Sequence, residues 1–128
     1  MRLKILFMLL LMLLLNTASF AAVDTNYVNK VVDAIYWAEG GAKTKYPYGI
    51  KTVKVANTAE ARNRCTFLVS HCFDRWDNNG RNGLFLETLQ KTFCPTAGRL
   101  SYNERRLNGY WLTNVRYFIA NPKPVPDR

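Results

Sequence analysis

The stretch that decides the fold is NYVNKVVDAIYWAEGG, which runs from Asn26 to Gly41. Its inward-facing residues recur at helical spacing and end in a carboxylate: Val28, Val32, Ile35 and Glu39. Asp24 or Thr25 can cap the start, and the glycine pair 40–41 stops the helix. The pattern predicts a helix over residues 26–39 that carries an acid at its C-terminal end.

Glu39 is the chemical candidate of this stretch. A carboxylate in line with an apolar stripe is rarely left without a partner. Burial and the negative end of the helix dipole both disfavour its ionised form, so both should raise the pKa of Glu39. A carboxyl group that stays protonated near neutral pH is what a general acid requires. The alternative from the residues alone is a structural glutamate paired with Lys43 or Lys45.

The segment that follows, residues 43–56, combines turn and strand patterns. The tetrapeptide YPYG at 46–49 has turn chemistry, and the strand-like residues after it are Ile50, Val53 and Val55. We expect a short β element here that lines a cleft beside the carboxylate, with Gly49 allowing a tight turn.

Apolar periodicity predicts three more helices. They cover about 59–77, about 82–93, and a last segment that carries Trp111, Val115, Phe118 and Ile119 and ends before Pro122. A loop over 96–108 is expected before the last helix. The fold class is therefore mainly α, or α+β with one small β element.

The N-terminus has the pattern of a cleavable secretory signal. Positive charge at Arg2 and Lys4 precedes 11 apolar residues, and small residues at 19 and 21 suit a signal peptidase. A bilayer span takes about 20 apolar residues, so a retained anchor is the weaker alternative. We predict a signal peptide at 1–21, one domain at 22–120 and a flexible proline-rich tail at 121–128.

Charge narrows the choice of partners. The whole chain carries +9, and loss of Arg2 and Lys4 leaves +7 on the mature chain. A basic exported protein favours anionic partners such as cell-wall polymers, lipid headgroups or nucleic acid. No basic run is interleaved with aromatics, which argues against nucleic acid. We expect a periplasmic or secreted protein with no stable membrane anchor after cleavage.

Three cysteines are present, at Cys65, Cys72 and Cys94. Two cysteines seven residues apart on one helix are separated by about 10 Å, which exceeds the reach of a bridge, about 7 Å. Either Cys65 or Cys72 therefore pairs with Cys94, if any pair forms. One histidine and no Cys-x-x-Cys argue against a metal or other cofactor.

The segment AEGGAKTKYPYGI at 38–50 resembles the catalytic stretch of lysozyme-like muramidases and lytic transglycosylases. In Glu-Gly-Gly muramidases, a helix-ending Glu-Gly-Gly is followed by a loop and Tyr-Gly-Ile. The mature chain is also similar to small exported bacterial proteins that share this stretch, a cysteine like Cys65, a Cys-Pro like 94–95 and an ending like 111–118.

The resemblance implies a small lysozyme-like helical domain that cleaves peptidoglycan glycan strands. Glu39 would be the catalytic acid and base, while Tyr46, Tyr48 and Gly49 would bind substrate. It also favours Cys65–Cys94 as the bridge and leaves Cys72 as the odd thiol.

Two departures from the muramidase pattern matter for the chemistry. The acidic, glycine-rich loop of those enzymes is replaced by KTKY at 43–46, and a second carboxylate would have to be Glu60, Asp74 or Asp77. A single acid fits lytic transglycosylases better than the two-carboxylate scheme of most glycosidases. The alternative function is a cationic exported module that binds cell wall or a partner without catalysis; a secreted antibacterial effector would use the same chemistry on another target.

Overall fold

The computed structural model describes residues 24–126, which form four α-helices and two single-turn 3-10 helices. The α-helices are α2 (Thr25–Ala38), α3 (Thr58–Asn78), α4 (Phe85–Phe93) and α5 (Tyr102–Ala120), and the 3-10 helices are η1 (Gly41–Lys43) and η2 (Pro47–Gly49). The mainly helical fold class is confirmed. The predicted signal peptide at 1–21 lies outside the described residues.

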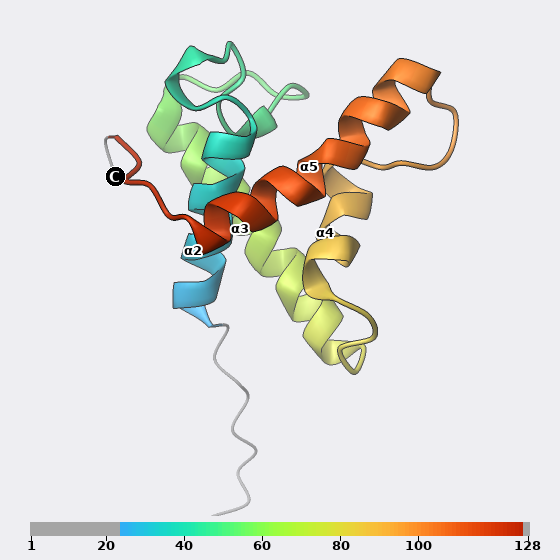
Figure 1. The fold of residues 1–128 in the computed structure, drawn as a ribbon. Helices are drawn as coiled ribbons and strands as arrows, with labels where there is room; N and C mark the ends of the chain where they lie inside the picture. Colours follow the sequence, from blue (N-terminus) through green and yellow to red (C-terminus); the bar gives the residue numbers. More distant parts are fainter. Residues whose placement is uncertain (1–23, 127–128) are drawn as a thin grey trace, which may run out of the picture.

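The core forms where α5 and α3 pack against α2 (Figure 1). α4 contacts both α3 and α5, and η2 contacts α2 and α3. The buried side chains at the centre come from all four helices and include Val32, Ile35, Cys65, Val69, Leu89 and Val115. The N-terminal half of α5 projects beyond this core, as Figure 1 shows at the orange end of the helix.

Side-chain caps set the starts of three helices. The Asp24 carboxylate accepts a hydrogen bond from the backbone N–H of Tyr27, which begins α2 as predicted. Asn57 caps α3 in the same way. Ser101 and Glu104 form a reciprocal capping box that begins α5 at Tyr102. The predicted loop over 96–108 is therefore wrong in its second half.

The predicted β element is wrong: residues 43–56 contain no strand. The chain instead makes η1 and η2, and Tyr48 and Gly49 have positive φ angles of 57° and 70°. Left-handed residues turn the backbone sharply and break the extended conformation that a strand needs. The apolar residues Ile50 and Val55 pack against the helical core instead of a partner strand.

The C-terminal segment is also packed, in contrast to the flexible tail predicted at 121–128. Val125 is buried, and the indole N–H of Trp37 donates to the carbonyl of Lys123 at 3.3 Å. The Lys123 ammonium lies 5.6 Å from the centre of the Trp37 ring. Residues 122–125 therefore cover α2, and of the predicted tail only 127–128 lie outside the described residues.

Within residues 24–126, no helix combines the length and apolarity needed to cross a membrane.

Candidate functional site

Glu39 is the residue that ends α2. Its backbone N–H still donates to the carbonyl of Ile35 at 2.9 Å, and Gly40 after it turns left-handed with φ 106°. The glycine stop therefore places the Glu39 side chain at the rim of the core, where it is half-buried. The predicted helix end and the position of the acid are confirmed.

One carboxylate oxygen of Glu39 is held by α5. The indole N–H of Trp111 donates to Oε1 at 3.0 Å, across 72 residues of sequence. Trp111 is only 5% exposed, and its ring stacks on Phe93 with centroids 5.5 Å apart and planes 20° from parallel. The donor is thus fixed by packing before any ligand arrives, which is the arrangement of a preorganised site.

The other oxygen of Glu39, Oε2, is unpaired among the described residues and not completely enclosed. Oε2 has no hydrogen bond to residues 24–126. In the buried and half-buried residues of this range, every fully enclosed polar side-chain atom has a hydrogen-bond partner, so the unpaired Oε2 is not fully enclosed. Oε2 is therefore reachable from outside, while Oε1 is anchored. A carboxyl group bound on one side and open on the other can pass a proton to a ligand.

Gly49 closes one side of the carboxyl group. A Cβ at this position would lie 2.7 Å from Glu39 Cδ and 2.9–3.0 Å from its oxygens. A Cβ there would force the Glu39 carboxyl group to move, and the φ of +70° also favours glycine. The structure therefore brings Gly49 to Glu39 as predicted, and it explains why this position is glycine.

The surroundings raise the pKa of Glu39 above its usual 4.5. Burial is the main cause; the Trp111 hydrogen bond and the charge of Lys51 act in the opposite direction but are smaller. The predicted direction is confirmed. Glu39 forms no ion pair with described residues, so the alternative pairing with Lys43 or Lys45 is not formed.

Tyr48 does not line a surface. Its side chain is 1% exposed, so the expectation that it stacks on substrate is wrong. Its hydroxyl accepts a hydrogen bond from Arg62 at 3.2 Å, and the same Arg62 nitrogen lies 2.6 Å from Asp33. This network ties η2 to α2 and α3 and thereby holds Gly49 against Glu39.

Tyr46, the other predicted substrate tyrosine, remains available at the surface. It is exposed, and the ammonium groups of Lys45 and Lys51 lie 5.6 Å and 5.9 Å from its ring centre. Lys51 is also the cation that acts on Glu39. The Lys51 charge therefore acts on both the Tyr46 ring and the Glu39 carboxyl group.

The cysteines are free thiols, so the expected Cys65–Cys94 bridge is not formed in the structure. Cys65 is fully buried on α3, and Cys94 is half-buried at the end of α4. Burial, with a contribution from the negative charge of Glu39, raises the pKa of Cys94 to about 11. Burial likewise raises the pKa of Cys65. Both thiols therefore stay protonated near the carboxyl group and act as neutral packing.

None of the candidates for a second carboxylate joins Glu39. Glu60 accepts from the backbone N–H of Ala56 and pairs with Arg64, and these contacts hold the pKa of Glu60 below its usual value. Asp77 pairs with Arg81 at the other end of α3, and Asp74 is exposed. Within residues 24–126, the site has one carboxyl group.

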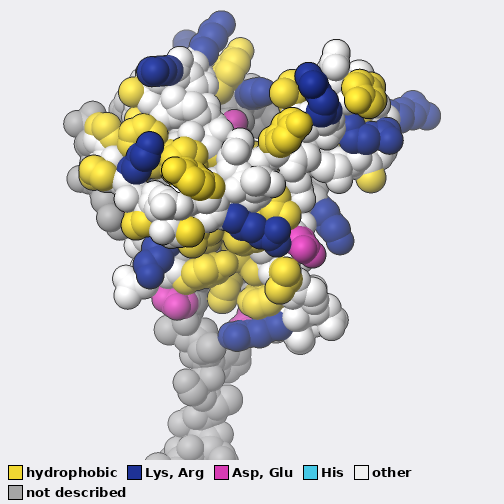
Figure 2. Space-filling view, viewed as in Figure 1, with side chains coloured by type: hydrophobic (Ala, Val, Ile, Leu, Met, Phe, Trp, Pro, Cys, Tyr) yellow, Lys and Arg dark blue, Asp and Glu magenta, His cyan; other side chains and the backbone are white. Residues whose placement is uncertain are grey.

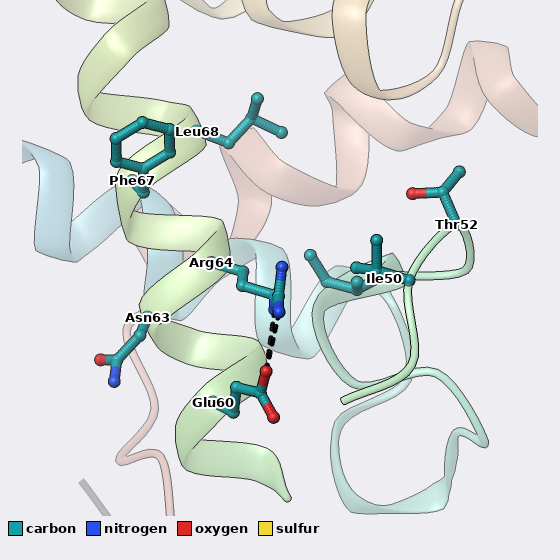
Figure 3. Close-up of a pocket in the computed structure, with 8 residues that line it drawn as sticks. Ile50, Thr52, Glu60, Asn63, Arg64, Phe67 and Leu68 are labelled. Atoms are coloured by element: carbon teal, nitrogen blue, oxygen red, sulfur yellow. Dashed lines mark hydrogen bonds and ion pairs between the residues drawn. The ribbon is translucent and has the colours of Figure 1, made fainter. Parts of the chain in front are cut away.

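The surface near this site is hollowed. Figure 2 shows a notch between the lobe formed by residues 40–57 and the projecting half of α5, with acidic atoms at its base. A separate open groove of about 520 Å³ lies between α3 and the chain that follows Gly49. Figure 3 shows Ile50 facing Arg64 across this groove, with Phe67 and Leu68 on the same helix. Glu39 does not line this groove, so the groove is separate from the carboxyl group.

Comparison with known protein families, curated proteins and solved structures finds no match to this chain. Residues 24–126 also contain no group of three His, Cys, Asp or Glu side chains that could hold a metal ion. The site must therefore be interpreted from Glu39 and its immediate neighbours.

Proposed function

We propose that this chain is an exported peptidoglycan-cleaving enzyme of the lytic transglycosylase or muramidase type. Glu39 is its general acid and base. The observation that carries this proposal is the Glu39 carboxyl group itself, which is half-buried, raised in pKa, anchored at Oε1 by Trp111 and open at Oε2.

The reaction follows from this geometry. Protonated Glu39 donates its proton from the open oxygen to the glycosidic oxygen as the sugar–sugar bond breaks. The resulting carboxylate is stabilised by the Trp111 N–H, because a hydrogen bond from a neutral donor favours the ionised form. The carboxylate then takes a proton from the attacking hydroxyl, which regenerates the acid. No other side chain is needed for the proton balance.

A single carboxyl group favours the intramolecular version of this reaction. In a lytic transglycosylase the attacking group is the 6-hydroxyl of the cleaved sugar, and it closes a 1,6-anhydro ring. The sugar supplies its own nucleophile, so no second acid is required to position water. The predicted signal peptide and the charge of +7 on the mature chain suit an anionic, extracytoplasmic polymer.

The test is digestion of purified peptidoglycan by the mature chain, residues 22–128, between about pH 4 and 8. Mass spectrometry of the soluble products should find anhydro-ended fragments, and Glu39→Gln should abolish their release. Asp77→Asn is the matched control, since it neutralises an acid at the end of a different helix. Equal activity of wild type and Glu39→Gln would refute the proposal.

The alternative is a cationic module that holds cell wall without cleaving it. The net charge and the single carboxyl group motivate it. In that case the mature chain would bind peptidoglycan in a salt-sensitive way and release no fragments at any pH.

A further inference from the structure

The projecting half of α5 carries exposed tyrosines that the fold does not use. Tyr102, Tyr110 and Tyr117 are 80%, 57% and 55% exposed. The opposite face of the helix is the one that packs, through Trp111 and Val115. Large exposed aromatic side chains gathered on one face of a small protein commonly mark a binding surface.

These tyrosines form one stripe along the helix. Tyr102, Arg106, Tyr110, Thr113 and Tyr117 follow one another in steps of three or four residues, so they share a face. Tyr102 and Tyr110 are separated by about 12 Å along the axis, from a rise of 1.5 Å per residue. We call Tyr102, Arg106, Tyr110 and Tyr117 the tyrosine stripe.

The stripe is positively charged. Arg99, Arg105 and Arg106 are exposed and form no ion pair with residues 24–126. Figure 2 shows Lys and Arg side chains intermixed with hydrophobic ones over this end of the molecule. Of the described acids near α5, Glu104 is engaged in the capping box of the helix and Glu87 pairs with Arg116. The surface therefore suits a ligand with both apolar faces and negative charge.

The stripe and the candidate catalytic carboxyl group lie on different faces of α5. Tyr110 precedes Trp111, the donor to Glu39, and Leu107 lies one turn before Trp111 at a position that is still exposed. Because the stripe lies on the face opposite Trp111, a ligand held along it contacts α5 away from the Trp111–Glu39 pair.

We propose that the tyrosine stripe holds peptidoglycan at a surface of α5 separate from the Glu39 carboxyl group, an inference that rests on the proposed function. Sugar rings present apolar C–H faces that stack on tyrosine, and the peptide stems supply carboxylates for the unpaired arginines. The stripe spans the length of a few sugar rings, which matches a polymer better than a small molecule.

The first test measures binding of the mature chain to insoluble peptidoglycan sacculi. It is made in the Glu39→Gln background, so that cleavage does not interfere. Tyr102→Ala with Tyr110→Ala should weaken binding about tenfold or more. Phe67→Ala, which removes an exposed aromatic ring from α3, should leave binding unchanged. Circular dichroism confirms that each variant keeps its helices.

The second test addresses charge. Arg105→Gln with Arg106→Gln should weaken binding at low salt and have little effect at high salt. Lys54→Gln with Lys91→Gln makes the same change in net charge away from the stripe and should change binding much less. Equal losses from the two pairs would show attraction by net charge alone and overturn the inference.

Kinetics separate this inference from the proposed function. In the active chain, the tyrosine pair should raise KM with little change in kcat, because it removes binding shared by substrate and transition state. If Glu39→Gln abolishes cleavage but the tyrosine variants still bind sacculi as the wild type does, the inference about the stripe is overturned and the proposed function stands. Loss of binding to duplex DNA or phosphatidylglycerol vesicles, but not to sacculi, would also overturn it.

Discussion

The ends of α2 and α3 have almost the same local structure. The residue that ends each helix has nearly the same φ, −87° at Glu39 and −88° at Asn79. A glycine with positive φ follows in both cases, Gly40 at 106° and Gly80 at 78°. Each end also has an indole donor from a nearby tryptophan, Trp111 or Trp76.

The two ends differ in what surrounds them. At the end of α3, Asp77 pairs with Arg81, and nothing lies within 4 Å of a Cβ built on Gly83. At the end of α2, Glu39 forms no ion pair with residues 24–126, Gly49 packs against it, and the indole donates to the acid itself. The comparison teaches that neighbouring residues are enough to end a helix, whereas a carboxyl group with a raised pKa requires contacts from residues distant in sequence.

The largest expected effect is on activity. Glu39→Gln should lower the rate of glycan cleavage about 10²–10⁴-fold, the usual contribution of general acid–base catalysis. Asp77→Asn should change the rate little, because Asp77 is committed to Arg81 at the other helix end. Initial rates on purified glycan strands measure the effect of each variant. A similar loss of rate in the two variants would contradict a specific role for Glu39.

The second-largest effect is expected from the packing around Gly49, compared with that around Gly83. Gly49→Ala should lower the free energy of unfolding by about 2–4 kcal/mol, from left-handed strain and overlap with the carboxyl group. Gly83→Ala has nearly the same φ, +73°, but open surroundings, so its cost should be about 1–2 kcal/mol. Urea unfolding of both variants gives the difference, and equal costs would contradict the contact at Gly49.

The indole donors provide the third comparison. Trp111→Phe should cost about 1–3 kcal/mol of stability. The hydrogen bond from Trp111 lowers the pKa of Glu39 in the wild type. Its loss in the variant should therefore raise that pKa and shift the basic limb of the pH–rate profile to higher pH. Trp76→Phe removes a donor to a backbone carbonyl and should leave the profile in place. A Trp111→Phe profile that coincides with wild type would remove Trp111 from the proton chemistry.

The smallest effect should come from Lys51. Its charge lowers the pKa of Glu39, so Lys51→Met should move the basic limb slightly to higher pH. The shift should shrink in high salt, since Lys51 is exposed. Lys54→Met is the control, and stability should change by less than about 0.5 kcal/mol in either variant. A shift of the same size from both lysines would indicate net charge as the cause.

The sequence was informative where signals are local. The apolar stripe, the Asp24 cap and the glycine pair predicted α2 and the position of Glu39 within about one residue. The capping box at Ser101 and Glu104 is also a local signal, and it marks the start of α5. Helix boundaries of this kind depend on a few neighbouring residues and can be read without the fold.

Other features depended on the fold and could not be read locally. The sequence places Trp111 on the last predicted helix but does not indicate its bond to Glu39, which joins residues 72 positions apart. Tyr48 was placed at a surface, because the burial of its ring depends on Arg62 and the packing of η2. The strand-like residues of 50–55 found no partner strand, so their β propensity had no structural consequence.

Ionisation of Glu39 should also be visible in stability. Its folded pKa is raised, so the folded state keeps its proton to higher pH than the unfolded chain does. The contribution of Glu39 is therefore complete below about pH 4.5 and is lost as pH rises through the folded pKa. Relative to Glu39→Gln, wild type should lose stability over that interval and then level off.

The most direct measurement is the titration of the Glu39 side-chain carboxyl carbon by NMR in the folded mature chain, assigned by the signal that disappears in Glu39→Gln. A midpoint above 4.5 is expected, together with a higher midpoint in Trp111→Phe. A midpoint at or below 4.5 would contradict the account, since a carboxyl group ionised that readily would hold no proton for a glycosidic bond near neutral pH.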